Sequence, residues 1–389
     1  MPRKLQKGWI QTYKDYVENQ ESPPIFHIWI SILIISGAMK RNVWISRGAY
    51  TLYPNQYMFL ITKSGSCRKS VAMELGMDLL RELDGIKIVY ERASLEGLMD
   101  RMQGLMAIPS GEKEGRVIPD GSVFIHADEL ANLFGKASYI NDLMSFLTAA
   151  YSSRSRLEFL TRNKGLCSIQ NPCPSMMSGT TPEQFGDIFP SISLASGFLG
   201  RVLLVVGERG QRIGNPSIRY DLRESLVEDL KDISSMYGEM AMSKETNKKF
   251  VEWYENLPPV PKGLPAFYER KHDHVLKTAM ILSASDNSSM VIEDYHIEEA
   301  KNLIKYLEET LEDALEFVGA TAESALADRI VDIVRSAGTE GISHSVLMRR
   351  VYRSIKGAAE FKAIIDTLCD SKRIKMSASG KAIKYHFNE

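Results

Sequence analysis

The stretch Gln56-Tyr-Met-Phe-Leu-Ile-Thr-Lys-Ser-Gly-Ser-Cys-Arg-Lys-Ser70 joins an apolar, strand-like run to a loop of small residues that ends in Lys-Ser. Such a loop at the start of a helix suits phosphate binding: its N–H groups face the anion, the lysine reaches the β- and γ-phosphates, and the serine hydroxyl binds Mg²⁺. The match to G-x-x-x-x-G-K-[ST] is incomplete, because Lys63 and Arg68 occupy the two glycine positions. A Lys-Ser pair after a strand is also common outside such sites. The predicted phosphate-binding set is Gly65, Ser66, Cys67, Arg68, Lys69 and Ser70.

A second run, Val123-Phe-Ile-His-Ala-Asp128-Glu129, is an apolar strand that ends in two adjacent carboxylates. Phosphoryl transfer from Mg²⁺·ATP needs one acidic residue to hold the metal shell and another to orient and deprotonate the attacking water. We assign the first role to Asp128 and the second to Glu129. One acidic residue at a strand end is often only a polar turn, but the preceding Lys-Ser loop favours an ATPase with ATP and Mg²⁺ as cofactors.

Two later segments fit the same chemistry. The run Cys173–Pro182 predicts a strand that ends in hydroxyls, which position water and sense the γ-phosphate. We favour Thr180 for this role, with Thr181 and Asn171 as alternatives and a plain Thr-Pro turn as the structural interpretation. Arg201 comes immediately before a buried strand, where it can reach the γ-phosphate of a neighbouring subunit as an arginine finger. A surface salt bridge is the other interpretation of Arg201.

The composition is that of a globular protein without strong net charge. The chain has 389 residues, 44% of them hydrophobic, and a net charge of −1, so no general basic excess indicates nucleic acid. Four cysteines without CxxC spacing argue against a disulfide scaffold or zinc knuckle, and no signal-peptide pattern follows Met1, so a cytoplasmic location is expected. The apolar stretch Ile25–Met39 is shorter than the roughly 20 residues of a membrane span and predicts a buried helix, whose end is marked by Gly37 followed by Lys40 and Arg41. No catalytic role is assigned to His27.

Hydrophobic periodicity divides the chain into four parts. Residues 1–52 predict a helical N-terminal segment, 53–215 an α/β core with a parallel sheet covered by helices, 216–319 a helical region, and 320–389 a winged helix-turn-helix. The predicted strands of the core are Tyr57–Thr62, Ile86–Glu91, Val123–Ala127, Ser175–Gly179 and Val202–Val206. The predicted helices of the third part are Lys244–Asn256, Ala266–Ser285 and Glu293–Val318.

The segments SGSCRKS (64–70), VFIHADE (123–129), NPCPSMMSGTTPE (171–183) and GFLGRVLLV (197–205), followed by a helical region, resemble a family of P-loop ATPases of phages, plasmids and integrated elements. Members of this family are thought to be replicative helicases and often lie beside primases. The order is also similar to that of AAA+ helicases of the MCM and superfamily-three type. The resemblance covers residues 5–310 and implies an AAA+-like P-loop NTPase core with a helical lid. It implies Lys69 and Ser70 as the P-loop pair, Asp128 and Glu129 as the Walker B pair, Thr180 as sensor 1, and Arg201 as the finger.

Two further regions are candidates for contacts with DNA and with the nucleotide. Residues 154–169 predict a hairpin around an Asn-Lys-Gly turn. In the resembled helicases such a hairpin enters the central pore, which implies that Arg162 and Lys164 meet the phosphates of a single strand. A basic surface hairpin without a ligand is the alternative. On the long helix of the lid, Arg270 is the first choice for a second sensor, ahead of Lys271 and Lys277.

The C-terminal part has its basic residues on its second helix and wing, whereas its third helix carries Glu360, Asp366 and Asp370. This pattern favours phosphate contacts without base reading, and a protein–protein role is the alternative. The expected DNA contacts are Arg349, Arg350, Arg353 and Lys381.

The sequence therefore predicts an ATP-driven DNA helicase or translocase of a mobile genetic element that acts in replication. An arginine finger supplied in trans has meaning only in an oligomer, so a homo-oligomeric ring, a hexamer, is expected. A primase is a candidate partner, and no membrane is involved. The alternatives are a non-unwinding AAA+ ATPase, such as a loader or defence motor, and a winged-helix DNA-binding regulator that binds nucleotide without turnover.

Overall fold

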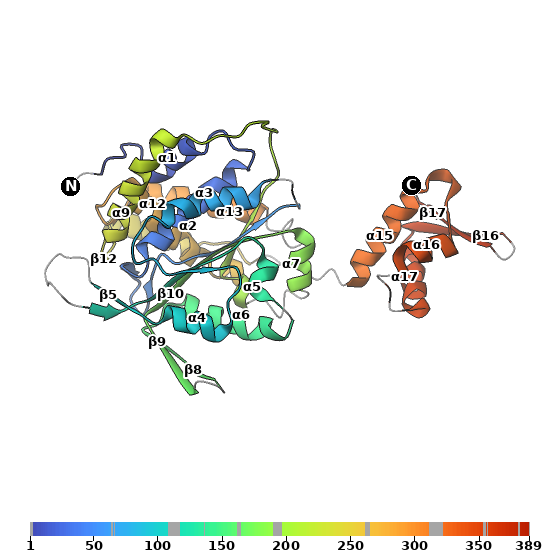
Figure 1. Ribbon diagram of the computed structural model, residues 1–389, viewed down its shortest axis with the longest axis horizontal. Coiled ribbons are helices and arrows are strands. Elements are labelled where there is room, and N and C mark those ends of the chain that lie inside the picture. The colour runs from blue at the N-terminus through green and yellow to red at the C-terminus, as the bar shows by residue number, and fades with distance from the viewer. Residues whose placement is uncertain are drawn as a thin grey trace. The chain divides into compact units, whose positions relative to one another are not determined.

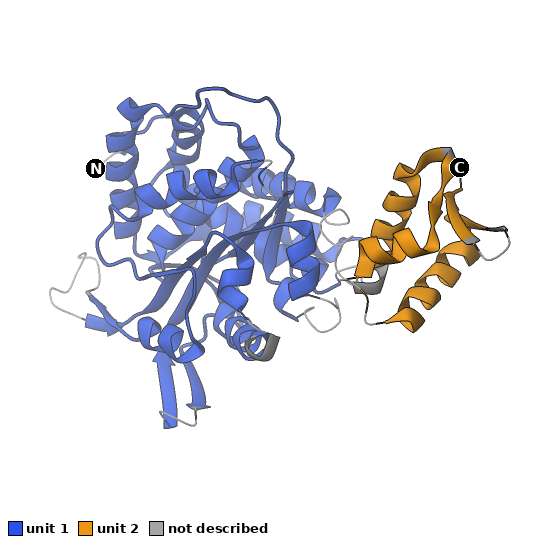
Figure 2. Ribbon diagram, turned by 45° about the vertical axis from the view of Figure 1, so that its right-hand side comes forward, with its two compact units in different colours: residues 1–318 blue, residues 319–389 orange. Residues whose placement is uncertain are grey.

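The computed structural model divides the chain into two compact units, residues 1–318 and 319–389, which Figure 2 colours separately. Each unit has its own hydrophobic cluster. The structure describes residues 3–63, 65, 67–107, 117–135, 137–161, 165–189, 197–260, 265–310, 322–352, 355, 357–379 and 382–388.

A five-stranded, all-parallel sheet forms the centre of the first unit (Figure 1). The predicted mixed α/β architecture with a parallel sheet is thereby confirmed. The strand order is β11-β3-β10-β7-β4, so β10 lies between β3 and β7. The strands are β3 (Tyr57–Ile61), β4 (Ile88–Tyr90), β7 (Gly121–Ala127), β10 (Pro172–Thr180) and β11 (Val202–Val206).

Strand β10 begins three residues before the predicted start at Ser175, and this additional part contains two prolines, Pro172 and Pro174. Pro172 and Pro174 pair with β7, whereas pairing with β3 begins only at Met176. Proline lacks the N–H that a strand bonded on both sides needs, so it is tolerated where only one neighbour is present. At its start, this central strand therefore has a paired neighbour on one side only, as an edge strand has.

Helices cover both faces of the sheet (Figure 1). On one face, α2 and α3 contact β10 and pack against α1 and α9, and on the other α4, α5 and α6 contact β7 or β10. A short helix, α7, follows β10. Their bounds are α1 (Trp9–Tyr16), α2 (Pro24–Met39), α3 (Lys69–Leu80), α4 (Leu95–Met102), α5 (Leu130–Phe134), α6 (Ala137–Tyr151), α7 (Pro182–Ile188) and α9 (Arg223–Ser235).

The apolar helix α2 is buried along nearly its whole length, as predicted, and Gly37 lies inside it. A Cβ on Gly37 would lie 2.6 Å from the ring of Phe124 on β7, so this glycine permits close helix–sheet contact inside the helix. The helix ends at Met39, where Lys40 takes a positive φ of 51°. Within the described part of the chain, no helix has the length and apolarity to span a membrane.

The N-terminal segment and the helical region after the sheet share the hydrophobic cluster of the sheet. The expected all-helical character of residues 1–52 is wrong in one respect, since β1 and β2 form a small sheet with β12 from the helical region. The predicted helix Ala266–Ser285 is two helices, α11 and α12. The bounds are β1 (Val43–Ser46), β2 (Thr51–Leu52), η1 (Tyr220–Leu222), β12 (Gly238–Glu239), β13 (Ala241–Met242), α10 (Lys244–Glu255), α11 (Pro265–Tyr268), α12 (Lys271–Asp286), β14 (Val291–Ile292) and α13 (Asp294–Glu309).

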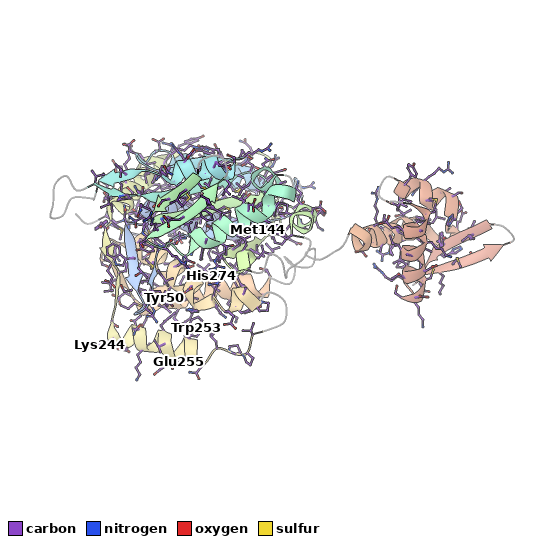
Figure 3. All side chains as sticks on the ribbon, turned by 90° about the horizontal axis from the view of Figure 1, so that it is seen from below. Tyr50, Met144, Lys244, Trp253, Glu255 and His274 are labelled. Atoms are coloured by element: carbon purple, nitrogen blue, oxygen red, sulfur yellow. The ribbon has the colours of Figure 1, made fainter. Side chains whose placement is uncertain are left out.

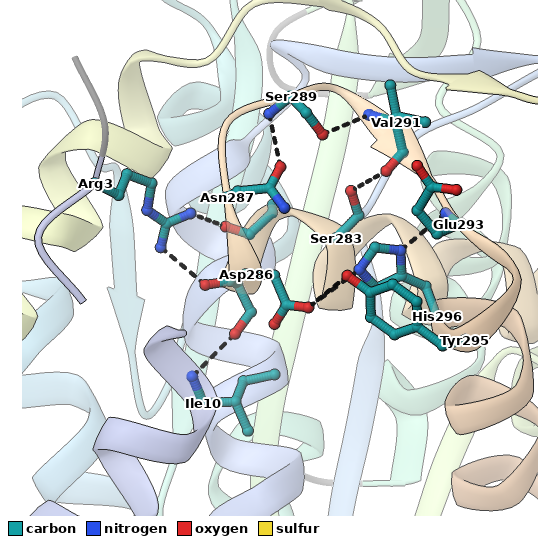
Figure 4. A network of polar contacts seen from close by, with 12 residues as sticks. Arg3, Ile10, Ser283, Asp286, Asn287, Ser289, Val291, Glu293, Tyr295 and His296 are labelled. Atoms are coloured by element: carbon teal, nitrogen blue, oxygen red, sulfur yellow. Dashed lines mark hydrogen bonds and ion pairs between the residues drawn. The ribbon is translucent and has the colours of Figure 1, made fainter. Parts of the chain in front are cut away.

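A polar network ties the two ends of this unit together (Figure 4). Arg3 donates to the Ser285 carbonyl at 3.0 Å and pairs with Asp229, and the Ile10 N–H donates to Ser285 Oγ at 3.0 Å. Asp286 accepts from Tyr295 on α13 at 3.0 Å. The first helix is therefore fastened to the carboxyl end of α12.

Among its described residues, the second unit has three α-helices and a three-stranded antiparallel sheet of order β15-β17-β16. Strand β15, which the sequence did not predict, pairs with β17. The bounds are α15 (Ala322–Ser336), η2 (Gly338–Glu340), β15 (Ile342–Ser343), α16 (His344–Val351), α17 (Ala358–Asp370), β16 (Ile374–Ser379) and β17 (Ala382–Phe387).

Candidate functional site

The loop after β3 leads directly into α3. The Thr62 N–H donates to the carbonyl of Thr180 at 3.3 Å, so the start of the loop is held at the carboxyl end of β10. Gly65 has φ 66° with open space around it, and Arg68, the N-cap residue of α3, has φ 50° and ψ 39°. This is the left-handed conformation that glycine adopts most readily, so position 68 keeps a glycine-like backbone without a glycine. Ser66 lies outside the described residues.

Cys67, one of the predicted loop residues, turns its thiol into the core. Its side chain is 1% exposed, and the Thr62 hydroxyl donates to Sγ at 3.1 Å. Sγ also lies 3.7 Å from the carbonyl oxygen of Gly207, just after β11. The side chain thus anchors the loop, and any contact with a ligand falls to the backbone.

Lys69, the first residue of α3, reaches the end of β10. A Cβ on Gly179 would lie 2.9 Å from Lys69 Cε and 2.7 Å from the carbonyl oxygen of Asp128, so only glycine leaves room for the lysine here. Burial lowers the pKa of Lys69, while the nearby Glu129 carboxylate and Cys67 act in the opposite direction. The lysine and the second carboxylate of the pair are therefore neighbours.

The two carboxylates lie where β7 ends. Asp128 is half-exposed, and His126 Nε2 lies 3.4 Å from Asp128 Oδ1. Burial raises the pKa of Asp128, with His126 opposing it and Glu91 adding to it. Glu129 is the N-cap residue of α5 but makes no capping bond, so its carboxylate is not used to hold the helix.

An open pocket of about 610 Å³ is lined by three of the predicted residues, Ser70, Asp128 and Glu129. Within the described ranges, no cluster of three His, Cys, Asp or Glu side chains forms a ready-made metal site. Mg²⁺ usually takes one or two carboxylates together with phosphate and water, and a serine hydroxyl and an aspartate are oxygen ligands of this kind. The residues present therefore fit a magnesium ion that arrives with a nucleotide. The pocket is lined by Ser70, Glu91, Arg92, Asp128, Glu129, Ala131, Asn132 and Gly135.

Glu91, which the sequence did not single out, supports the end of β7. Its N–H donates to the His126 carbonyl at 2.7 Å, and its carboxylate accepts from the Asp128 N–H at 3.0 Å and from Asn132 Nδ2 at 2.8 Å. The carboxyl ends of parallel strands meet at one edge of a sheet, and Glu91 directly follows β4. The position of Glu91 at the end of a predicted parallel strand could therefore have indicated it as a site residue.

The hydroxyls after β10 are already engaged. Thr180 is fully buried and donates to the Thr181 carbonyl at 3.2 Å, and Thr181 Oγ1 accepts from the Gln184 N–H at the start of α7. Gln184 Nε2 in turn donates to Glu129 Oε2 at 3.4 Å. Asn171, the third alternative, precedes the first residue of β10 and donates to the Pro119 carbonyl, so it lies at the other end of the sheet.

Arg201 and Arg270 lie together at the amino edge of the sheet. Val202 pairs with Tyr57, the first residue of β3, and four residues of strand, or about 13 Å, separate Tyr57 from the residue that precedes the loop. Burial and the nearby Arg270 lower the pKa of Arg201. His274, labelled in Figure 3, is fully buried, with Nε2 3.1 Å from the Gly200 carbonyl oxygen, and holds α12 against this segment. Neither arginine lines the pocket that contains Ser70, Asp128 and Glu129.

The two alternatives to Arg270 have structural partners instead. Lys271 pairs with Glu308 at 2.7 Å. Lys277 is buried and donates to the carbonyl and the side-chain oxygen of Asn55 at 2.9 and 2.8 Å. Both lysines thereby hold α12 in place.

The predicted hairpin is present and extends away from the sheet (Figure 1). It consists of β8 (Arg156–Thr161) and β9 (Gly165–Gln170), paired antiparallel. A second hairpin, β5 (Leu105–Ala107) with β6 (Val117–Pro119), was missed because its strands have only three residues each. Arg162 and Lys164 lie outside the described residues.

In the second unit, Arg349 and Arg350 are exposed on α16, and α17 exposes Asp366 and Asp370. Basic side chains of the second helix and acidic side chains of the third helix are therefore both exposed at the surface. Arg353 and Lys381 lie outside the described residues.

No protein-family model matches this sequence, and no curated protein is significantly similar to it.

Proposed function

We propose that the chain is an ATP hydrolase that works as a ring-forming DNA helicase or translocase of a mobile genetic element. The observation that carries this proposal is the meeting of Lys69 with the Asp128–Glu129 pair at the carboxyl edge of the sheet. Lys69 is close enough to Glu129 for the carboxylate to act on its pKa, and Ser70, Asp128 and Glu129 line one pocket. Lysine, hydroxyl and two carboxylates are the groups that phosphoryl transfer to water requires.

In this mechanism Glu129 orients a water molecule and takes its proton as the water oxygen bonds to the γ-phosphorus. The bond from that phosphorus to the bridging oxygen of ADP breaks, and ADP keeps the electron pair. Lys69 stabilises the charge that develops on the phosphate oxygens. Mg²⁺, held through Ser70 and Asp128, would neutralise charge on the β- and γ-phosphates when bound.

The position of Arg201 supports an oligomer. It lies at the amino edge of the sheet, while the P-loop follows the carboxyl end of β3, so it serves as a finger only for a neighbouring subunit. Arg270 lies beside it and would act from the same side. We infer a closed ring, a hexamer, in which each pocket receives arginines from the next copy.

DNA is the proposed substrate of the motor. The hairpin β8–β9 would contact a strand in the pore through Arg162 and Lys164. The three helices and three-stranded sheet of the second unit support a winged helix, in which Arg349, Arg350, Arg353 and Lys381 contact phosphates. A primase would be a partner in replication.

The decisive experiment compares ATP hydrolysis by the wild type, Lys69→Ala and Glu129→Gln, with and without single-stranded DNA. We expect hydrolysis that DNA stimulates, and a fall of at least about 100-fold in either variant, because each loses a group that acts in the transition state. Glu129→Gln should still bind ATP. Wild-type hydrolysis no greater than that of the variants would instead indicate a regulator that binds nucleotide without turnover.

Unwinding of a forked duplex separates the helicase from a loader or another non-unwinding motor. The helicase should displace the strand only with hydrolysable ATP. DNA-stimulated hydrolysis without displacement on any fork would exclude the helicase and retain the ATPase.

A further inference from the structure

The outer face of the hairpin β8–β9 changes character along its length. Side chains alternate between the two faces of a strand, so Arg156, Glu158 and Leu160 share one face of β8. They pair across the hairpin with Gln170, Ser168 and Leu166. This face is polar near the sheet, where Arg156 pairs with Glu158 and donates to Ser168, and becomes apolar only at the Leu160–Leu166 pair.

The opposite face of the hairpin accounts for its packing on the body. Cys167 is 7% exposed and Ile169 is fully buried, and the Phe159 ring lies 5.1 Å from that of Phe146 on α6. This face therefore packs the hairpin against the body. The leucine pair lies on the other face of the hairpin.

The two leucines are unusually exposed. Leu160 is 83% exposed and Leu166 is 64% exposed. Single apolar residues on a surface are ordinary, but Leu160 and Leu166 lie directly opposite each other on paired strands and form one exposed apolar pair. The sequence between the two strands adds Arg162 and Lys164.

In the sequence, two cations fall between the two leucines, and apolar and cationic side chains match the two chemical parts of a nucleic acid strand. Cations bind phosphates, while leucine and other apolar side chains insert between base steps and unstack them. We propose that Leu160 and Leu166 form a wedge that contacts the bases where duplex DNA opens into single strands. This inference rests on the proposed function and names the part of the DNA that the hairpin recognises.

The test uses the full-length protein and a fork that carries 2-aminopurine in the last base pair of the duplex, with a non-hydrolysable ATP analogue. The wild type should increase 2-aminopurine fluorescence, which reports unstacking. The double variant Leu160→Ser/Leu166→Ser should lose most of this increase, because one base step is no longer opened. In a separate assay with hydrolysable ATP, it should unwind the fork about tenfold more slowly than the wild type. Its hydrolysis stimulated by single-stranded DNA should stay within about twofold of the wild type, since phosphate contacts persist.

Two matched variants serve as controls. Leu160→Met/Leu166→Met keeps apolar side chains and should retain both signals. Tyr220→Ser removes another strongly exposed apolar side chain, 74% exposed and outside the hairpin, and should change neither.

Three results would overturn the wedge. The first is a serine double variant with unchanged fluorescence and unwinding. The second is a serine double variant that loses both single-strand binding and the stimulation of ATP hydrolysis by DNA, which would assign the leucines to binding single-stranded DNA. The third is a smaller assembly by mass photometry, which would assign them to a contact between copies. Failure of the proposed function is distinct, because it would appear as a wild type without DNA-stimulated hydrolysis.

Discussion

Arg68 stands where the phosphate-binding pattern has glycine, yet it takes the left-handed conformation that glycine favours. Its side chain is exposed and lies 3.4 Å from Glu21, a contact too solvated to offset much strain. Gly179 presents the reverse situation, since the space for its Cβ is taken by Lys69 and the Asp128 backbone. Single residues therefore set both the shape of the loop and the room for its lysine.

Replacing Gly179 by alanine should disable the site. The new methyl group would displace Lys69 or push β10 from the end of β7, so we expect ATP hydrolysis to fall at least tenfold and stability to fall by about 1–3 kcal/mol. Steady-state kinetics and urea unfolding measure the two effects. Gly214→Ala, at a position with open space, is the control, and equal activity of the two variants would contradict the geometry.

Substitutions at Arg68 should separate backbone strain from side-chain chemistry. Arg68→Gly relieves the left-handed strain and should raise the free energy of unfolding by up to about 1 kcal/mol. Arg68→Val should lower the free energy of unfolding by about 1–2 kcal/mol. Thermal unfolding of both variants measures this difference. A glycine variant less stable than the valine variant would show that the loop does not need this conformation.

At the scale of elements, the helix α2 is almost completely buried, and its burial removes a histidine side chain from water. Nearly all its residues are buried, including His27, whose two ring nitrogens have no hydrogen-bond partner among the described residues. Burial lowers the pKa of His27 to about 4. A neutral imidazole is thus buried near the Tyr13 ring of α1.

This histidine makes stability depend on pH. The unfolded chain binds a proton at His27 near pH 6.5, while the folded chain does so only near pH 4, so stability is full above pH 6.5 and is lost as the pH falls toward 4. Between pH 7.5 and 5 the loss from this group should be about 2 kcal/mol. Urea unfolding at both pH values should show a smaller difference in His27→Leu. An unchanged difference would refute the assignment.

At the scale of the whole molecule, the chain consists of two units with separate cores. The cluster of the second unit is built entirely from residues after 325, among them Ile330, Leu347, Phe361 and Tyr385. We therefore expect its folding not to depend on the first unit.

A fragment of residues 319–389 should fold by itself. Its own buried cluster should give one cooperative unfolding transition by circular dichroism, as small domains with a complete core do. A fragment without a transition would show that the second unit depends on the first.

The proposed ring can be tested by mixing two inactive variants. Lys69→Ala and Arg201→Ala should each be inactive, but an equal mixture should recover up to about a quarter of wild-type hydrolysis, because one interface in four then combines an intact lysine with an intact arginine. ATP hydrolysis after co-refolding measures this. Absence of any recovery would place Arg201 outside the neighbour's site.

By itself, the sequence determined the parallel sheet, the α/β class, the buried helix α2 and the loop that ends in Lys69-Ser70. These follow from local patterns, since apolar runs of strand length and small-residue loops need no knowledge of distant contacts. The candidate carboxylates could be predicted for the same reason, because parallel strands present their carboxyl ends at one edge.

Only the tertiary structure decided which residues meet. It placed Glu91 against Asp128, Gly179 beneath Lys69, and Arg270 beside Arg201 at the opposite edge of the sheet. It also admitted Pro172 and Pro174 into a central strand, because β3 does not yet run alongside them. These facts depend on strand order and on the length of each strand relative to its neighbours, which residues far apart in the chain set through packing and which no local pattern contains.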